Sequence, residues 1–263
     1  MSTPVTTEAS ALPVIYEAPP AVSQGFGLYA AATLLDTGEV SRELIAGVDI
    51  YPFNCDSGVG TYSTELCDDA PAVKAAGERG EVSHFDPLVV YAAAECAAGP
   101  QLATPAERAR QMMVLHEPLL VESAFATRLL SDAGAPTVVP DLAAAIGTLE
   151  EWLGERGYPG LIHASRRYAA GAAALQAASG SGLLRTSIGN TWVFGGGYAD
   201  TLGATLIATG PVTVWRSSLF EREVTTGSSS TAAHNNSVYA LSERVVTTGY
   251  ECEAFAVQIN PAP

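Results

Sequence analysis

The sequence has 263 residues, of which 48% are hydrophobic and 16% are charged, and this composition excludes a generally disordered chain. Its 28 acidic and 13 basic residues give a net charge of −15, which repels nucleic-acid phosphates and argues against sequence-specific DNA or RNA binding. No apolar run reaches the roughly 18–20 residues of a membrane helix, and residues 1–10 lack the features of a secretory signal, so we expect a soluble protein made in the cytoplasm.

Residues 1–24 are too poor in large apolar side chains to fold alone. They are rich in Thr, Ser, Ala and Pro, which predicts an N-terminal arm. This arm is either a disordered tail or a segment that becomes ordered against a neighbouring subunit. A short helix is expected over 28–35 with Gly38 as its end, and the Val, Ile, Tyr and Phe content of 44–53 predicts a strand.

Residues 55–83 contain several glycines and scattered charge, without a hydrophobic period. Such a long irregular stretch is uncommon inside a compact domain, so we expect a loop that leaves the body and is covered by a partner. The four cysteines, Cys55, Cys67, Cys96 and Cys252, have no zinc-ligand spacing. Two states stay open: four free thiols, or a Cys55–Cys67 disulfide formed after the protein leaves the cell.

The clearest helix start lies at 104–107. Thr104 supplies a capping hydroxyl, Pro105 the first helical position and Glu107 the third, as in a capping box. Apolar residues at helical spacing then extend to residue 131. Pro118 lies inside this segment and predicts a kink or a break.

A helix, a strand and another helix are expected next. Asp141 caps the first of these helices, and Gly157 ends it. Residues 161–164 form a short buried strand, and Ser165 is expected to cap an alanine-rich helix to residue 178. The remaining strands are predicted over 182–186, 191–194, 205–215, 238–246 and 253–259. Because the helices cluster centrally and the strands towards the C-terminus, the fold class is α+β.

The sequence contains no motif that assembles a catalytic centre. There is no phosphate-binding loop and no G-x-S-x-G elbow, and the glycine triplet at 195–197 indicates a hairpin turn. The four histidines, His84, His116, His163 and His234, lack metal-ligand spacing. We therefore assign no catalytic, cofactor-binding or metal-binding residue and expect no cofactor. The alternative from another class is an enzyme with a dispersed active site at His84 and Asp86.

The order of elements resembles the tailed-bacteriophage major capsid protein fold, which encapsulin nanocompartments share. The resemblance is carried by the order of arm, long loop, long helix, helix–strand–helix unit and closing strands. Locally it is clearest over 158–165, 182–198 and 238–259.

The resemblance implies a domain division. It gives an arm at 1–24, the start of a peripheral domain at 25–49, an extended loop at 50–90, the peripheral domain with its spine helix at 91–140, an axial domain at 141–235 and closing peripheral strands at 236–263.

It also implies a non-enzymatic subunit of an icosahedral capsid, which self-assembles into hexamers or pentamers and encloses DNA in a virion assembled in the host cytoplasm. Its partners would be copies of itself, with a second shell or decoration protein, a scaffold and a portal as further candidates. Some members crosslink a loop lysine to a neighbour's asparagine; Lys74 lies in the right region, but nothing identifies its partner. The alternatives are an encapsulin-like compartment and a neck, tail or decoration protein.

Overall fold

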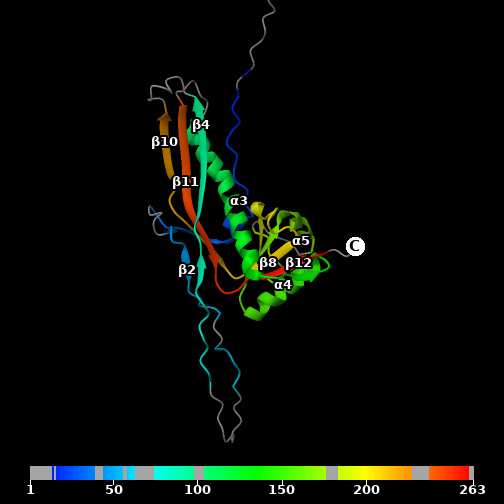
Figure 1. Ribbon diagram of the computed structural model, residues 1–263. Coiled ribbons are helices and arrows are strands. Elements are labelled where there is room, and N and C mark those ends of the chain that lie inside the picture. Colours follow the sequence, from blue (N-terminus) through cyan, green and yellow to red (C-terminus); the bar gives the residue numbers. More distant parts are fainter. Residues whose placement is uncertain are drawn as a thin grey trace, which may run out of the picture.

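The computed structural model describes residues 14, 16–38, 44–55, 58–62, 74–97, 104–175, 183–226 and 237–260. Within these ranges, two five-stranded sheets pack around one long helix, α3 (Pro105–Ala133) (Figure 1). In the described part of the chain, no helix has both the length and the apolar character needed to cross a membrane.

The first sheet is built around the long strand β11 (Ser237–Tyr250). It pairs antiparallel with β4 (Leu88–Ala97) along one edge, and with β10 (Phe220–Thr226) and then β9 (Val212–Arg216) along the other. The strand β1 (Thr33–Asp36) adds to β9 in parallel. α3 packs on one face of this sheet, and in Figure 1 the opposite face of β4 and β11 carries no helix.

The second sheet has the strand order β5 (Thr137–Val139), β12 (Phe255–Ile259), β8 (Thr205–Thr209), β6 (Leu161–Ser165) and β7 (Thr191–Gly195). Every residue of β6, β7 and β8 is buried. The cause is that both faces are covered, by α4 (Leu142–Arg156) and α5 (Ala169–Leu175) on one side and by α3 on the other. This arrangement explains the continuous apolar runs of these strands.

α3 begins with the predicted capping box. The Thr104 hydroxyl accepts a hydrogen bond from the Glu107 N–H at 3.2 Å, and the Glu107 carboxylate accepts one from the Thr104 N–H at 2.9 Å. The helix then runs through Pro118 to Ala133, so the break that the sequence allows there does not form. Proline inside a helix costs about 3 kcal/mol, and the packing of α3 against both sheets outweighs this cost.

α4 has the ends that the sequence predicts. The Asp141 carboxylate accepts a hydrogen bond from the Ala144 N–H at 2.8 Å, and Gly157 ends the helix in the left-handed conformation. The predicted cap of the next helix is wrong, because the Ser165 side chain makes no capping hydrogen bond and residues 166–168 form the 3₁₀ turn η1 (Arg166–Tyr168). α5 follows it to Leu175; residues 176–178 of the predicted helix lie outside the described residues.

Three predicted segments differ from the structure, two of them because their pairing partners lie far away in the sequence or belong to different sheets. The predicted helix over 28–35 is one turn, α1 (Leu28–Ala31), and then β1, in which residue 33 pairs with residue 213. The predicted strand over 205–215 is split between β8 and β9, which belong to different sheets. The predicted strand over 182–186 is reduced in its described part to an isolated bridge between Arg185 and Thr191.

The glycine triplet does not form a hairpin turn. Its last two residues begin a 3₁₀ turn, η2 (Gly196–Tyr198), and β6 lies between β7 and β8. A Cβ atom at Gly197 would collide with the Leu119 carbonyl oxygen of α3. Glycine is therefore required here for close packing against the long helix.

A short two-stranded ladder lies at the base of the irregular segment over 51–82. β2 (Val48–Ile50) pairs antiparallel with β3 (Ser83–Phe85). Residues 51–82 are here called the excursion, and Figure 1 shows their described parts leaving this ladder and extending away from both sheets. The described residues 55, 58–62 and 74–82 contain no helix or strand, as the sequence predicts, whereas the predicted strand over 44–53 is reduced to β2 and ends at Ile50.

The two sheets do not follow contiguous ranges of the chain. β9 and β10 precede residue 235 but pair with β11, whereas β12 lies after residue 236 and pairs with β8. The turn between β11 and β12 therefore carries the chain from one sheet to the other.

Candidate functional site

The root of the N-terminal arm is fixed by a buried carboxylate. The Glu122 side chain is 1% exposed, and its two oxygens accept hydrogen bonds from the N–H groups of Leu28 and Gly197, both at 2.8 Å. Each of these donors belongs to a different element, α1 or η2. Glu122 therefore joins the arm and the second sheet to the long helix.

Arg166 holds the residues just before α1. Its guanidinium donates to the Phe194 carbonyl oxygen at 2.9 Å, to the Gly25 carbonyl oxygen at 3.2 Å and to the Gln24 side chain. The Phe194 N–H also donates to the Phe26 carbonyl oxygen. The arm is thus attached over 24–28, and the carbonyl oxygen of the exposed Ala21 also accepts a hydrogen bond from the Gln111 side chain of α3 at 2.7 Å.

A second buried carboxylate, Glu117, lies one and a half turns earlier on α3. It accepts a hydrogen bond from the Tyr29 hydroxyl at 2.9 Å and lies 3.2 Å from the Arg244 guanidinium of β11. Burial, together with the negative charge of Glu117, raises the pKa of Tyr29 far above its usual value. Tyr29 therefore stays protonated and acts as a donor at any physiological pH.

The base of the excursion is held by Glu251, in the turn between β11 and β12. One carboxylate oxygen accepts hydrogen bonds from the N–H groups of Phe53 and Asn54, and the other accepts one from the Asn54 side chain at 2.7 Å. Burial opposes the ionisation of Glu251, but these three hydrogen bonds outweigh it and lower its pKa.

A disulfide joins the residue that follows Asn54 to the residue that follows Glu251. Cys55 is bonded to Cys252, with Cα atoms 5.9 Å apart and a sequence separation of 197. Both interpretations of the cysteines are therefore corrected: Cys55 is not free, and its partner is not Cys67, which lies outside the described residues. Cys96 is a free thiol.

The two legs of the excursion lie against each other. The Arg79 guanidinium donates to the Pro52 carbonyl oxygen at 2.9 Å, and the Lys74 ammonium lies 4.7 Å from the centre of the Tyr62 ring. A Cβ atom at Gly58 would collide with the backbone of Gly77. The legs therefore support each other, and their contacts with the body are at the base.

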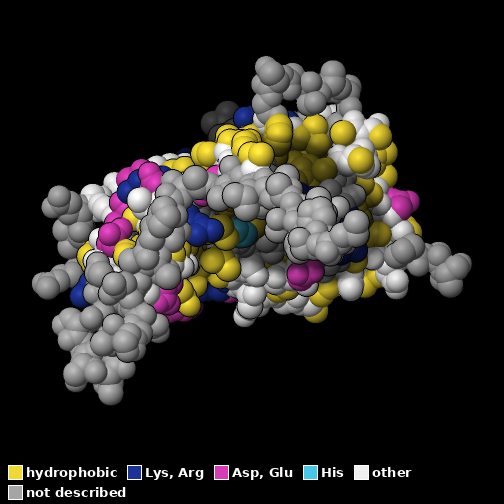
Figure 2. All heavy atoms as spheres, turned by 90° about the horizontal axis from the view of Figure 1, so that it is seen from above, with side chains coloured by type: hydrophobic (Ala, Val, Ile, Leu, Met, Phe, Trp, Pro, Cys, Tyr) yellow, Lys and Arg dark blue, Asp and Glu magenta, His cyan; other side chains and the backbone are white. Residues whose placement is uncertain are grey.

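The excursion exposes several large apolar side chains. Phe53 is 80% exposed and Val59 is 93% exposed, and Tyr51, Tyr62 and Val82 are also exposed. The arm adds Val14, Tyr16 and Val22, and the open face of the first sheet adds Val89, Tyr91, Phe220 and Tyr239. Figure 2, which views the molecule from above with the excursion on the far side, shows further hydrophobic side chains gathered on one side of this face. A monomer that works alone rarely exposes this much apolar surface.

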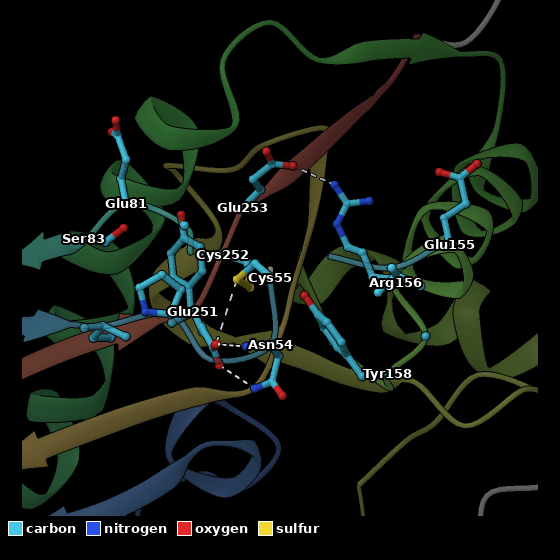
Figure 3. Close-up of a pocket in the computed structure, with 16 residues that line it drawn as sticks. Asn54, Cys55, Glu81, Ser83, Glu155, Arg156, Tyr158, Glu251, Cys252 and Glu253 are labelled. Carbon is cyan, nitrogen blue, oxygen red and sulfur yellow. Dashed lines mark hydrogen bonds and ion pairs between the residues drawn. A yellow bond between two sulfur atoms is a disulfide. The ribbon is translucent and has the colours of Figure 1, made fainter. Parts of the chain in front are cut away.

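A groove of about 780 Å³ lies between the base of the excursion and the end of α4 (Figure 3). Cys55 and Cys252 line it, with Tyr158 and Arg156 on the opposite wall. The Arg156 guanidinium is paired with Glu253 at 2.7 Å. The groove is open to solvent and gives small molecules access to the disulfide.

The His84–Asp86 pair lies on the protein surface. His84 Nδ1 lies 2.6 Å from an Asp49 oxygen, and its Nε2 lies 3.5 Å from Asp86. The His84 side chain is half-exposed and both carboxylates are more exposed still, so water surrounds the group. His116 is exposed on α3, and His234 lies outside the described residues.

His163 is fully buried between two hydroxyl groups. Its Nδ1 lies 3.0 Å from the Tyr198 hydroxyl and its Nε2 3.0 Å from the Thr209 hydroxyl. Burial lowers its pKa to about 3, so the ring is neutral in the folded protein. Its role is structural, as the sequence indicates.

This buried histidine predicts acid destabilisation. Because the pKa in the unfolded chain is about 6.5, the unfolded state binds more protons below that pH, and stability falls by about 1.4 kcal/mol per pH unit. We expect urea unfolding of the unassembled chain to give a free energy about 2 kcal/mol lower at pH 5 than at pH 7.5 from this residue alone. His163→Gln should lose that part of the pH dependence, and an unchanged slope in the variant would contradict the assignment.

Comparisons with known proteins identify the fold. No family model matches the chain, and no curated protein matches its sequence. A solved structure from Microbacterium phage Oxtober96 matches with a TM-score of 0.58 and 10% identity, over 97% of this chain and 96% of that one. A chain of the mature capsid of bacteriophage PhiM1 matches with a TM-score of 0.53 and 12% identity, over 97% and 93%. The chain has the tailed-phage capsid protein fold.

A third structure, the capsid of a native GTA particle, shares this capsid fold with a TM-score of 0.53 and 13% identity, over 94% of this chain and 100% of that one. The expected α+β class and the expected resemblance are therefore confirmed at the level of the fold. The matches span 94–97% of this chain.

Sequence reasoning missed the residues that hold the arm and the excursion. Glu122, Arg166 and Glu251 look like ordinary surface charges in the sequence, because their partners lie 28 to 198 residues away. One signal was available for Glu122. It lies on α3 in a run of apolar residues between Pro118 and Phe125, where an exposed carboxylate is less expected.

Proposed function

We propose that this protein is a structural subunit of a tailed-phage capsid and assembles with copies of itself into capsomers and a closed shell around DNA. The supporting observation is the combination of a capsid fold over nearly the whole chain with an excursion that exposes large apolar side chains, among them Phe53 and Val59. Apolar surface of this kind is stabilised when another molecule covers it.

In this proposal the first sheet and α3 form the peripheral domain, and the second sheet with α4 and α5 forms the axial domain. β12 then belongs to the axial domain and β9 and β10 to the peripheral domain, since that is how they pair. The excursion corresponds to the extended loop, and residues 1–24 to the arm. The site of action is the capsid, after assembly in the host cytoplasm.

The proposed role requires no catalysis, no cofactor and no specific contact with DNA. A net charge of −15 keeps the packaged DNA from adhering to the wall. A second shell protein, a decoration protein, a scaffold and a portal are further proposed partners. Lys74 lies over the Tyr62 ring, which gives it a structural role in the leg of the excursion without a crosslink.

Electron microscopy of the purified recombinant protein tests this function. We expect closed shells or hexameric and pentameric capsomers, in amounts that rise with protein concentration. Rings or tubes without shells would indicate a neck or tail protein instead. A chain that stays monomeric at every concentration and salt condition would contradict the proposal.

A further inference from the structure

The Cys55–Cys252 pair lies where the excursion meets the body, and its surroundings favour reversible chemistry. Both sulfurs border the open groove of Figure 3, and neither cysteine is fully buried. Small thiols and disulfides can therefore reach the bond. A structural disulfide in a core would be protected from them.

The backbone at Cys252 gives independent support. Its φ angle is 71°, in the left-handed region, where a non-glycine residue costs about 1–3 kcal/mol. Glycine would satisfy this turn without that cost. The presence of cysteine at such a position indicates that its thiol group has a chemical role there.

Glu251 brings the two cysteines together without a covalent bond. It holds the N–H groups of Phe53 and Asn54, so that the following residue, Cys55, lies beside Cys252, which follows Glu251. The three possible metal ligands Cys55, Glu251 and Cys252 lie within 4.8 Å of one another. However, both Glu251 oxygens are occupied by hydrogen bonds, which favours a disulfide over a metal ion.

We propose that Cys55 and Cys252 form a reversible redox tether between the excursion and the turn after β11, and that Glu251 is the positioning residue for its closure. In a reducing cytoplasm the two thiols are free and Glu251 alone holds the base of the excursion. In an oxidising environment the tether closes and fixes the excursion to both sheets through the β11–β12 turn. This chemistry does not depend on the proposed function.

The oxidant is a low-molecular-weight disulfide, RSSR. The thiolate of one cysteine attacks a sulfur of RSSR, forms a mixed disulfide and releases RS⁻. The second cysteine thiolate then attacks the protein sulfur of that mixed disulfide and releases a second RS⁻. Two protein thiols are oxidised, one RSSR is reduced to two RSH, and the two thiol protons go to the leaving groups.

The first test counts thiols in the full chain after equilibration with oxidised or reduced glutathione, followed by alkylation in denaturant and peptide mapping. We expect the oxidised protein to have two fewer free thiols than the reduced one, with Cys55 and Cys252 peptides linked. Cys55→Ser and Cys252→Gly should abolish the difference, whereas Cys96→Ser should keep it. A Cys55–Cys67 link, or four free thiols after oxidation, would overturn the proposal.

The second test measures the positioning role. The equilibrium between dithiol and disulfide is followed in glutathione buffers, and we expect Glu251→Gln to lower the effective concentration of the two thiols about tenfold or more. Glu253→Gln, in the same turn but paired with Arg156, is the control and should leave the equilibrium unchanged. Equal equilibria for wild type and Glu251→Gln would remove the positioning role.

The third test measures the tether in the unassembled chain, so it stands apart from capsid formation. Because the bond closes a loop of nearly 200 residues, reduction should lower Tm by about 5–15 °C. Cys252→Gly, which relieves the backbone at this turn and cannot form the bond, should show the same Tm with and without reductant. A wild-type Tm that is the same with and without reductant would contradict a closed tether.

Discussion

Replacing Glu122 with alanine is expected to lower the free energy of unfolding by about 3–5 kcal/mol. The substitution leaves the N–H groups of Leu28 and Gly197 without acceptors in the interior, and an unsatisfied buried donor costs about 1–3 kcal/mol. The cavity left by the side chain adds to this cost. Urea unfolding of the unassembled chain measures the loss.

Two further variants sharpen this prediction. Glu122→Gln keeps one acceptor oxygen and should lose about half as much stability as alanine. Glu155→Gln changes an exposed carboxylate on α4 and should shift the free energy by no more than about 0.5 kcal/mol. Hydrogen exchange at Leu28 and Gly197 should accelerate in the alanine variant only. A loss below about 1 kcal/mol for Glu122→Ala would show that the carboxylate does not hold the arm root.

Exchanging Phe53 and Val59 for serine is expected to abolish assembly at concentrations where the wild type assembles. Full burial of each side chain contributes about 1.5–3 kcal/mol, so the double variant loses about 3–6 kcal/mol per subunit contact. The concentration at which assembly starts should rise at least about a hundredfold. Light scattering and sedimentation over a range of subunit concentrations measure this threshold.

The folded subunit should tolerate this double change, because both side chains are exposed and the Phe53 contact with Glu251 is made by its backbone N–H. Unfolding of the unassembled chain should therefore match wild type within about 1 kcal/mol. Glu81→Gln, on the returning leg of the same excursion, removes no apolar area and should assemble normally. Assembly of the Phe53→Ser/Val59→Ser variant at the wild-type threshold would show that the excursion lies outside the contacts between subunits.

The local parts of this fold were predictable because their causes are local. The capping box at Thr104, the cap at Asp141 and the left-handed end at Gly157 each depend on residues within one turn of the chain. The excursion was predictable for the opposite reason. Its lack of a hydrophobic period means that it cannot bury itself, and its described legs contain no helix or strand.

The long-range parts were not predictable from the same reasoning. β1 looks helical by its own spacing, and only its pairing with β9 makes it a strand. Cys55 has a sequence neighbour in Cys67, but the fold brings Cys252 to it from the far end of the chain. The division of residues 205–216 between two sheets depends on β11, which pairs with β9 and comes later in the sequence. In each case the deciding contact joins residues whose separation in sequence carries no local signal.

Hydroxyl-radical footprinting of the excursion in the unassembled chain and in the assembled shell tests most directly whether copies of the molecule cover it. Tyr51, Phe53 and Tyr62 are exposed in the single chain and react readily there. Their oxidation rates should fall several-fold in the shell, while that of buried Tyr198 stays low in both states. Equal rates for the three excursion residues in chain and shell would contradict the account.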